Sequence, residues 1–184
     1  ATDNTCDGID ENCSGLSDEG YVGSATSCGL GPCTAVGVTS CVAGTIVDSC
    51  TPRPRSPELC DGIDNDCDGI VDNVPSGVST LIAGKSGAVA QLGWPPVFSA
   101  DSYDVTRGVL GTLRAGGGNF TPSVDLCLAN GQAGTTASDP TLAPPTDGFW
   151  YLVRGNNCAG AGSFDEGVAS QIGTRDAEVG ASLL

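Results

Sequence analysis

The sequence has no histidine and no methionine among its 184 residues. Histidine is the usual general base of hydrolase triads and the commonest transition-metal ligand, so its absence excludes triads and histidine-based metal catalysis. Basic residues are also scarce, because 7 Lys and Arg stand against 22 Asp and Glu, which gives a formal net charge of −15. Nucleic acid and anionic membrane surfaces attract cationic proteins, so neither is expected as a partner.

Long apolar segments are missing as well. No run approaches the roughly 18 apolar residues of a membrane span, and the chain does not open at Ala1 with the basic and apolar pattern of a signal segment. We therefore expect no membrane span, and a chain that is mature or an excerpt of a longer protein. Its length allows one domain or two small ones, at about 100 to 200 residues per domain.

Cysteine, in contrast, is abundant. The chain has ten cysteines, an even number, and without histidine they favour disulfides over zinc fingers of the Cys/His type. Disulfides persist in oxidising compartments outside the cytosol. The sequence therefore predicts a secreted protein that is extracellular or at the cell surface.

Acidic residues and cysteines divide the chain into two parts. Residues 1–73 hold 13 acids, two bases and eight cysteines, whereas residues 74–184 hold nine acids, five bases and two cysteines. Asn73, Pro75 and Gly77 are turn formers that mark a boundary. We predict a disulfide-stapled module over residues 1–75 and a second domain over residues 76–184.

The first part contains an internal repeat, in which CDGIDENCSGLSD at 6–18 aligns with CDGIDNDCDGIVD at 60–72. Eight of the thirteen positions are identical. The second copy has the ligand order of a calcium loop: acids at positions 1, 3 and 5, a glycine turn at 6, a backbone carbonyl at 7 and an acid at 9. Its predicted ligands are Asp64, Asp66, Asp68, Ile70 and Asp72. The alternation lets short carboxylates converge on a hard cation that takes about six to eight oxygens.

The first copy keeps this order with weaker ligands, namely Asp10, Asn12, Ser14, Leu16 and Asp18. We therefore expect about two calcium ions, with the second loop binding more tightly. Position 12, normally a bidentate glutamate, is Tyr21 or Pro75, and no long helix pattern flanks either loop, so opening of helices by calcium is not expected. The remaining oxygens are expected from Asp7 and Asp61, from Glu19, from Glu58, or from water.

All ten cysteines are predicted to form disulfides. Cys6 with Cys13, and Cys60 with Cys67, have the spacing that would close each loop, which contributes about 2.5 kcal/mol in the chain-entropy model. The remaining predicted bond outside the spacer joins Cys127 to Cys158.

The spacer between the loops has two β-branched runs, 34–40 and 42–47, which predict a hairpin. Its four cysteines allow three pairings that the sequence leaves open. The pairing that we favour is Cys28 with Cys41 and Cys33 with Cys50.

The loop pattern C-D-G-x-D-N-D-C-D-G-x-x-D resembles the metal-binding repeat of secreted bacterial proteins that is often called MopE-like. The second copy matches every defined position, whereas the first has Glu11, Asn12 and Ser14 where the pattern has Asn, Asp and Asp. The resemblance covers about residues 1–75. It implies an extracellular, calcium-binding, disulfide-rich module that usually belongs to a larger surface protein and has no catalytic activity.

The second part is predicted to be mainly β, as an antiparallel sandwich. Short, partly alternating runs are separated by Gly, Pro, Asn and Asp, at residues 80–83, 88–94, 102–107, 123–128 and 149–154. Trp94 before two prolines, the Tyr-x-Val-x-Arg run at 103–107 and the segment 151–157 resemble a fibronectin type III domain. A glycine insertion at 116–118 and a long loop over 129–147 depart from that pattern.

Three classes of function are consistent with these features. The one we favour is a non-catalytic extracellular structural or adhesive protein that calcium and disulfides make rigid, with a calcium-stabilised fibre built from copies of the chain as a variant. Its partners would be calcium and copies of itself or other extracellular proteins. The alternatives are a sugar- or protein-binding module acting through the segments 108–120 and 129–147, and a secreted carboxylate-based hydrolase.

Overall fold

A computed structural model describes residues 2–165 and 174–182. The chain divides into two compact units, which are described separately here. The first comprises residues 1–56 and 61–71, and the second comprises residues 57–60 and 72–184. Within the described residues, no helix is long and apolar enough to span a bilayer.

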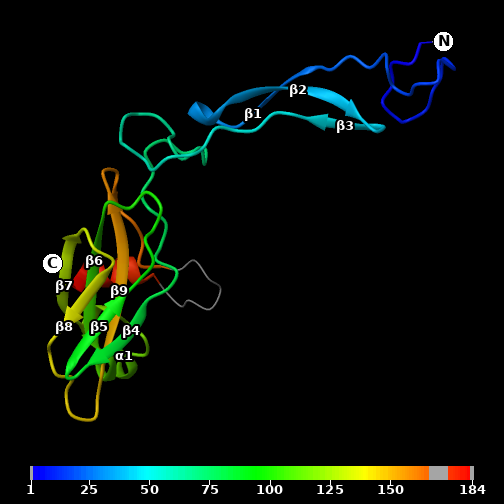
Figure 1. Ribbon diagram of the computed structural model, residues 1–184. Coiled ribbons are helices and arrows are strands. Elements are labelled where there is room, and N and C mark those ends of the chain that lie inside the picture. Colours follow the sequence, from blue (N-terminus) through cyan, green and yellow to red (C-terminus); the bar gives the residue numbers. More distant parts are fainter. Residues whose placement is uncertain (1, 166–173, 183–184) are drawn as a thin grey trace. The chain divides into compact units, whose positions relative to one another are not determined.

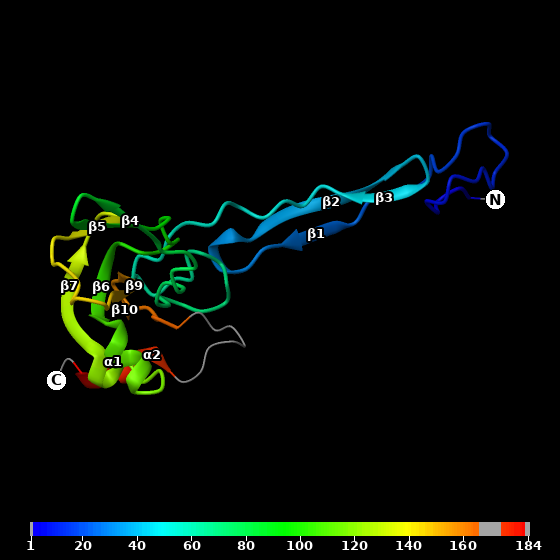
Figure 2. The same ribbon diagram turned by 90° about the horizontal axis from the view of Figure 1, so that it is seen from below.

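The first unit is built on an antiparallel three-stranded sheet of order β1-β2-β3 (Figures 1 and 2). The strands are β1 (Ala25–Cys28), β2 (Ala35–Val42) and β3 (Thr45–Asp48). Val36 and Val38 on β2 remain 84% and 50% exposed. The sheet therefore buries little apolar surface, and covalent links must supply much of the stability of this unit.

The predicted hairpin is present, and the residues of its turn suit the backbone conformation that they adopt. Val42 pairs with Thr45, and the two residues between them, Ala43 and Gly44, have φ of 51° and 74°. Two consecutive positive φ values are typical of the type I′ turns that match the twist of a two-residue hairpin. A Cβ on Gly44 would also lie 2.8 Å from the backbone nitrogen of Gly8.

Four disulfides are present, and their pairing differs from every predicted pair. The bonds are Cys6–Cys41, Cys28–Cys50, Cys33–Cys67 and Cys60–Cys158. Among the described residues, which include all ten cysteines, Cys13 and Cys127 are unpaired. The predicted loop closures are wrong: Cys6, Cys60 and Cys67 bond to cysteines outside their own loops, and Cys13 is unpaired. The observed bonds span 22 to 98 residues, and longer loops remove more entropy from the unfolded chain.

The second unit contains two antiparallel sheets, of orders β4-β5-β8 and β10-β9-β6-β7 (Figure 1). The strands of the first are β4 (Ile82–Ser86), β5 (Val89–Gly93) and β8 (Thr136–Asp139). Those of the second are β6 (Ser102–Val109), β7 (Val124–Gln132), β9 (Phe149–Asn157) and β10 (Gly160–Ala161). Two short helices, α1 (Leu110–Ala115) and α2 (Arg175–Ser182), complete this unit.

A shared core joins the two sheets of the second unit. It consists of Leu92, Trp94, Tyr103, Val105 and Val153, and the Trp94 and Tyr103 rings meet edge to face with centroids 5.5 Å apart. Along β6 the predicted alternation holds from Ser102 to Val105, whereas Thr106, Arg107 and Gly108 are all buried, so Thr106 does not face water. This unit is therefore a mainly β, antiparallel structure with a conventional hydrophobic core.

An ion pair is buried beside this core. The Arg107 guanidinium donates to both Asp139 carboxylate oxygens, at 3.1 and 2.9 Å, and lies 4.2 Å from the centre of the Phe149 ring. The Tyr151 hydroxyl donates to Asp139 Oδ2 at 3.0 Å. Burial opposes the charge of Asp139, but the Arg107 hydrogen bonds outweigh it and lower the pKa of that carboxyl to about 2.

Candidate metal centre

In the first loop, one backbone amide gathers two predicted ligands. The Ser14 N–H donates to Asp10 Oδ1 at 3.0 Å and to Asn12 Oδ1 at 2.8 Å. The next amide, that of Gly15, donates to Asp10 Oδ2 at 2.8 Å. Positions 1 and 3 of the loop are therefore drawn together over the amide of position 5.

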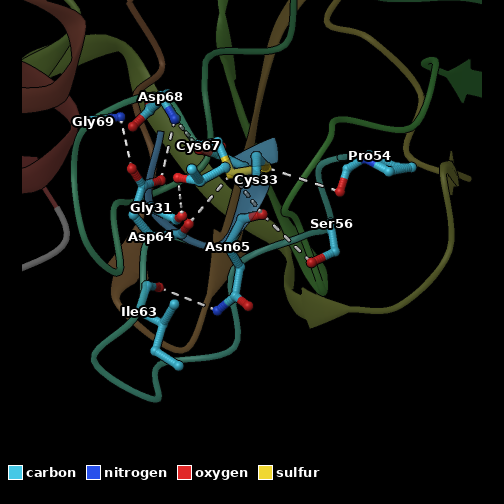
Figure 3. Close-up of a disulfide and its surroundings, with 12 residues drawn as sticks. Gly31, Cys33, Pro54, Ser56, Ile63, Asp64, Asn65, Cys67, Asp68 and Gly69 are labelled. Atoms are coloured by element: carbon cyan, nitrogen blue, oxygen red, sulfur yellow. Dashed lines mark hydrogen bonds between the residues drawn. A yellow bond between two sulfur atoms is a disulfide. The ribbon is translucent and has the colours of Figure 1, made fainter. Parts of the chain in front are cut away.

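The second loop has the equivalent hydrogen bonds, and Figure 3 shows those that Asp68 and Gly69 donate to Asp64. The Asp68 N–H donates to Asp64 Oδ1 and to Asp66 Oδ1, both at 3.1 Å, and the Gly69 N–H donates to Asp64 Oδ2 at 2.9 Å. Gly15 and Gly69 have φ of 93° and 97°, a conformation that side chains other than glycine rarely adopt. The shared D-x-x-x-x-G spacing therefore encodes one backbone shape in both copies.

Positions 5 and 7 of each loop are joined in the same way. The Leu16 N–H donates to Ser14 Oγ at 3.2 Å, and the Ile70 N–H donates to Asp68 Oδ1 at 2.8 Å. The short side chain at position 5 is thus held near the backbone of position 7, whose carbonyl is the predicted ligand.

Glu19 lies directly against the predicted ligands of the first loop. Its Oε1 accepts hydrogen bonds from Asn12 Nδ2 and Ser14 Oγ, each at 2.7 Å. These hydrogen bonds lower the pKa of Glu19 to about 2. Glu19 therefore lies beside two predicted ligands of the first loop, where the sequence analysis expected a further oxygen donor.

Asp7 and Asp61 each hold a turn at the start of their loops. Asp7 Oδ1 accepts the Ile9 N–H at 2.9 Å, and Asp61 Oδ1 accepts the Ile63 N–H at 3.0 Å. The Asp18 carboxylate also binds the start of its loop, because its Oδ1 accepts the N–H groups of both Asp7 and Gly8 at 3.0 Å. These acids organise the backbone around the site.

Asp3 is a site residue that the sequence analysis missed. It is only 2% exposed, its Oδ2 accepts the Asp18 N–H at 3.0 Å, and its Oδ1 is buried without a hydrogen-bond donor. Glu58 plays the matching part in the second copy, since it is 3% exposed and its Oε2 accepts the Asp72 N–H at 3.0 Å. Glu58 was already among the expected oxygen donors, and an acid at a similar place before the first cysteine of the first copy was the signal that could have identified Asp3.

Carboxylates crowd around Asp3. The neighbouring Glu11 carboxyl, burial and Glu19 together raise the pKa of Asp3 to about 7. Three acids in close proximity repel one another when all are ionised. A cation placed among them would remove this repulsion and would give the buried Asp3 Oδ1 a partner.

One further group of side chains that could bind a metal is ruled out as a metal site, because its two cysteines are bonded to each other. Cys6, Cys41 and Asp18 lie close together, but the two sulfurs are joined in a disulfide. A cysteine binds a metal as a thiolate, so this group offers a metal only the oxygens of Asp18.

Comparison with known families agrees with this geometry. Residues 1–19 and 49–73 match the Cu-binding MopE family model, whose description is "Putative metal-binding motif". The match includes both loops and covers less than half of the chain, and it bears out the resemblance seen in the repeat. No curated protein matches the chain. The first part of the protein therefore carries a metal-binding motif.

The second unit has a separate hollow of about 450 Å³. Apolar residues such as Ala90, Leu142 and Phe149 line it, together with Lys85. Asp147 is the single carboxylate in its lining, whereas glycoside hydrolysis normally uses two. The hollow gives no support to a carboxylate-based hydrolase.

Proposed function

We propose that the protein is a non-catalytic extracellular calcium-binding protein with a structural or adhesive role, in which each motif loop holds one Ca²⁺. The observation that carries this proposal is the buried Asp3 Oδ1, which has no hydrogen-bond donor. The Asp3 carboxyl also lies close to those of Glu11 and Glu19 at the first loop. Burying an unpaired carboxylate oxygen is costly. A bound cation removes that cost.

The chemistry of the donors favours calcium over the copper in the family name. The loops offer carboxylate, amide, hydroxyl and carbonyl oxygens, which suit a hard cation. Copper(I) sites in proteins are built mainly from thiolate, thioether and imidazole ligands. The chain has no histidine or methionine, and eight of its cysteines are in disulfides.

In the first loop, the proposed ligands are Asp10, Asn12, Ser14 and the Leu16 carbonyl, with Glu19 and Asp3 added. By the repeat, the second loop uses Asp64, Asp66, Asp68 and the Ile70 carbonyl, and Glu58 corresponds to Asp3. The extra acids offset the weaker side chains of the first loop. The difference in affinity between the loops should then be smaller than the motif alone predicts.

An extracellular structural role is supported by how the chain is stabilised. Four disulfides indicate an oxidising environment. The second unit, which we propose to be fibronectin type III-like, supplies a three-stranded sheet facing a four-stranded one around a shared core. A rigid calcium module joined to such a domain suits a subunit of a calcium-stabilised fibre.

Replacing Asp3 by asparagine tests the proposal. The change keeps the side-chain shape and removes the charge that faces the ion, so calcium affinity at one of the two sites should fall by about tenfold or more. Isothermal titration calorimetry measures this affinity. Asp48→Asn is the matched control, because Asp48 lies on β3 and binds Thr26 and the Cys50 amide; it removes the same charge and should leave both sites intact. Equal affinities in the two variants would contradict the role of Asp3.

A further inference from the structure

The hollow of the second unit continues the core between the two sheets. Leu92 on β5 and Val153 on β9 belong to that core. Ala90 and Tyr151 come two residues earlier on the same strands, so they lie on the same strand faces, and both line the hollow. The core therefore extends into a space of about 450 Å³ that remains open.

Small side chains leave this space open. Ala83 on β4 and Ala90 on β5 line it from one sheet, whereas β9 of the other sheet contributes the rings of Phe149 and Tyr151. Its volume is within the range of about 300 to 1,000 Å³ that ligand pockets have. Apolar side chains of a partner that entered the hollow would be removed from water, which is favourable.

The strand beside the hollow, β4, lies at the edge of its sheet (Figure 1). Within the described residues it pairs with β5 alone, and none of the backbone hydrogen bonds outside the helices and strands involves Ile82–Ser86. Every residue of this strand is exposed. One row of its backbone N–H and C=O groups is therefore free to pair with another extended segment.

A positive charge also borders the hollow. Lys85, the only lysine of the chain, lines it and pairs across the sheet with Ala90, so the two side chains share a face. None of the ion pairs among the described residues includes Lys85. Asp147, the carboxylate of the lining, instead accepts the N–H groups of Gly111 and Gly148 at 2.8 and 2.7 Å. The charge that complements this site is therefore negative.

We propose that an extended acidic segment of a partner protein binds along β4 as an added strand, with apolar side chains in the hollow and a carboxylate beside Lys85. Backbone hydrogen bonds to the free edge hold the segment, and the hollow and Lys85 select its side chains. A lysine on an edge strand disfavours pairing with a second copy of the same edge, because like charges meet. The site lies within the second unit and does not require calcium.

Two synthetic peptides test the charge of the partner. Each is about seven residues long, the length of an ordinary strand, and alternates threonine with valine. The central valine is replaced by aspartate in one peptide and by lysine in the other. Fluorescence polarisation of the labelled peptides measures their Kd. The aspartate peptide should bind about fivefold more tightly, as an exposed ion pair allows, and Lys85→Glu should reverse this order.

The variant Ala90→Leu tests whether side chains of the peptide enter the hollow. The larger side chain occupies that space from β5, so the Kd of the aspartate peptide should rise by about tenfold or more. Gln91→Leu is the matched control, because Gln91 is the next residue of β5, is exposed and lies on the opposite face; its Kd should be unchanged. Unfolding followed by tryptophan fluorescence checks that both variants fold.

Strand addition also predicts which amides of the peptide matter. Alternate residues of a strand direct their N–H groups to opposite edges, and one edge faces β4. Methylation of the amide nitrogens of one alternate set should therefore abolish binding, whereas methylation of the other set should have little effect.

Three results would overturn the proposal: equal affinities for the aspartate and lysine peptides, an unchanged Kd in Ala90→Leu, or no binding of either peptide at about 1 mM. Decanoate is the probe for a different class of ligand. If decanoate binds in a manner that depends on Lys85 while neither peptide binds, the hollow is a site for small amphipathic anions, and the proposal is wrong.

Discussion

Removing calcium is expected to increase amide hydrogen exchange about 100-fold in both motif loops. A site with a Kd of about 10 μM in about 1 mM calcium is stabilised by about 2.7 kcal/mol, which corresponds to that factor. The amides that report it are those that hold the ligands, on Ser14, Gly15, Asp68 and Gly69. Hydrogen exchange measured by mass spectrometry, with calcium or with chelator, gives the ratio directly.

The second unit provides the internal control for this experiment. Strands β6 and β9 lie far from the loops in sequence and pair with each other through eight residue pairs, so their exchange should not depend on calcium. Both tryptophans, Trp94 and Trp150, are also in the second unit, and their fluorescence reports its unfolding separately. Equal exchange in the loops with and without calcium would contradict calcium binding by the motif.

Replacing Asp139 by alanine should destabilise the second unit by about 3 to 5 kcal/mol, because it leaves the Arg107 charge buried beside the core without its main partner. Asp139 is fully buried, and Arg107 is 6% exposed. Denaturant unfolding followed by tryptophan fluorescence measures the loss. Asp125→Ala is the matched control: Asp125 also pairs with Arg107, but its side chain is 39% exposed, so its removal should cost about 1 kcal/mol or less.

The same ion pair predicts how this unit responds to acid. The folded-state pKa of Asp139 is about 2, below the roughly 3.9 of an unfolded chain. Its contribution is therefore fully present above about pH 4 and is lost as the pH falls towards 2. In Asp139→Ala this part of the pH dependence should vanish. Equal costs for Asp139→Ala and Asp125→Ala would show that the buried pair does not stabilise the unit.

The sequence was most informative where structure is set by neighbouring residues. The backbone of the motif loops could be predicted because alternating acids and a glycine at fixed spacing determine it, and Asp10 and Asp64 make the same hydrogen bonds in the two copies. The turn at Gly44 is local in the same sense. Most strands of the second unit were visible because their inward residues, such as Tyr103 and Val105, are large and apolar.

The features that depend on distant segments could not be predicted. The pairing of Cys60 with Cys158 joins residues 98 apart, and no pattern in either segment encodes it. Strand β8, within the predicted long loop, is short and polar and is held by pairing with β5 and by the buried Asp139. Asp3 lies outside the repeat at 6–18 and reaches the loop through hydrogen bonds from the Asp18 and Gly20 amides.

The most direct test of the central claim is a calorimetric titration of the oxidised protein with calcium. Two ions should bind per chain, and Asp66→Ala should remove one of them, while Asn12→Ala should weaken the other by a smaller factor because Asp3 and Glu19 remain. Copper(I), which prefers soft thiolate and thioether ligands, should bind at neither loop, since their donors are oxygens. A titration without binding heat that equilibrium dialysis confirms as no binding, or sites that take copper and not calcium, would contradict the account.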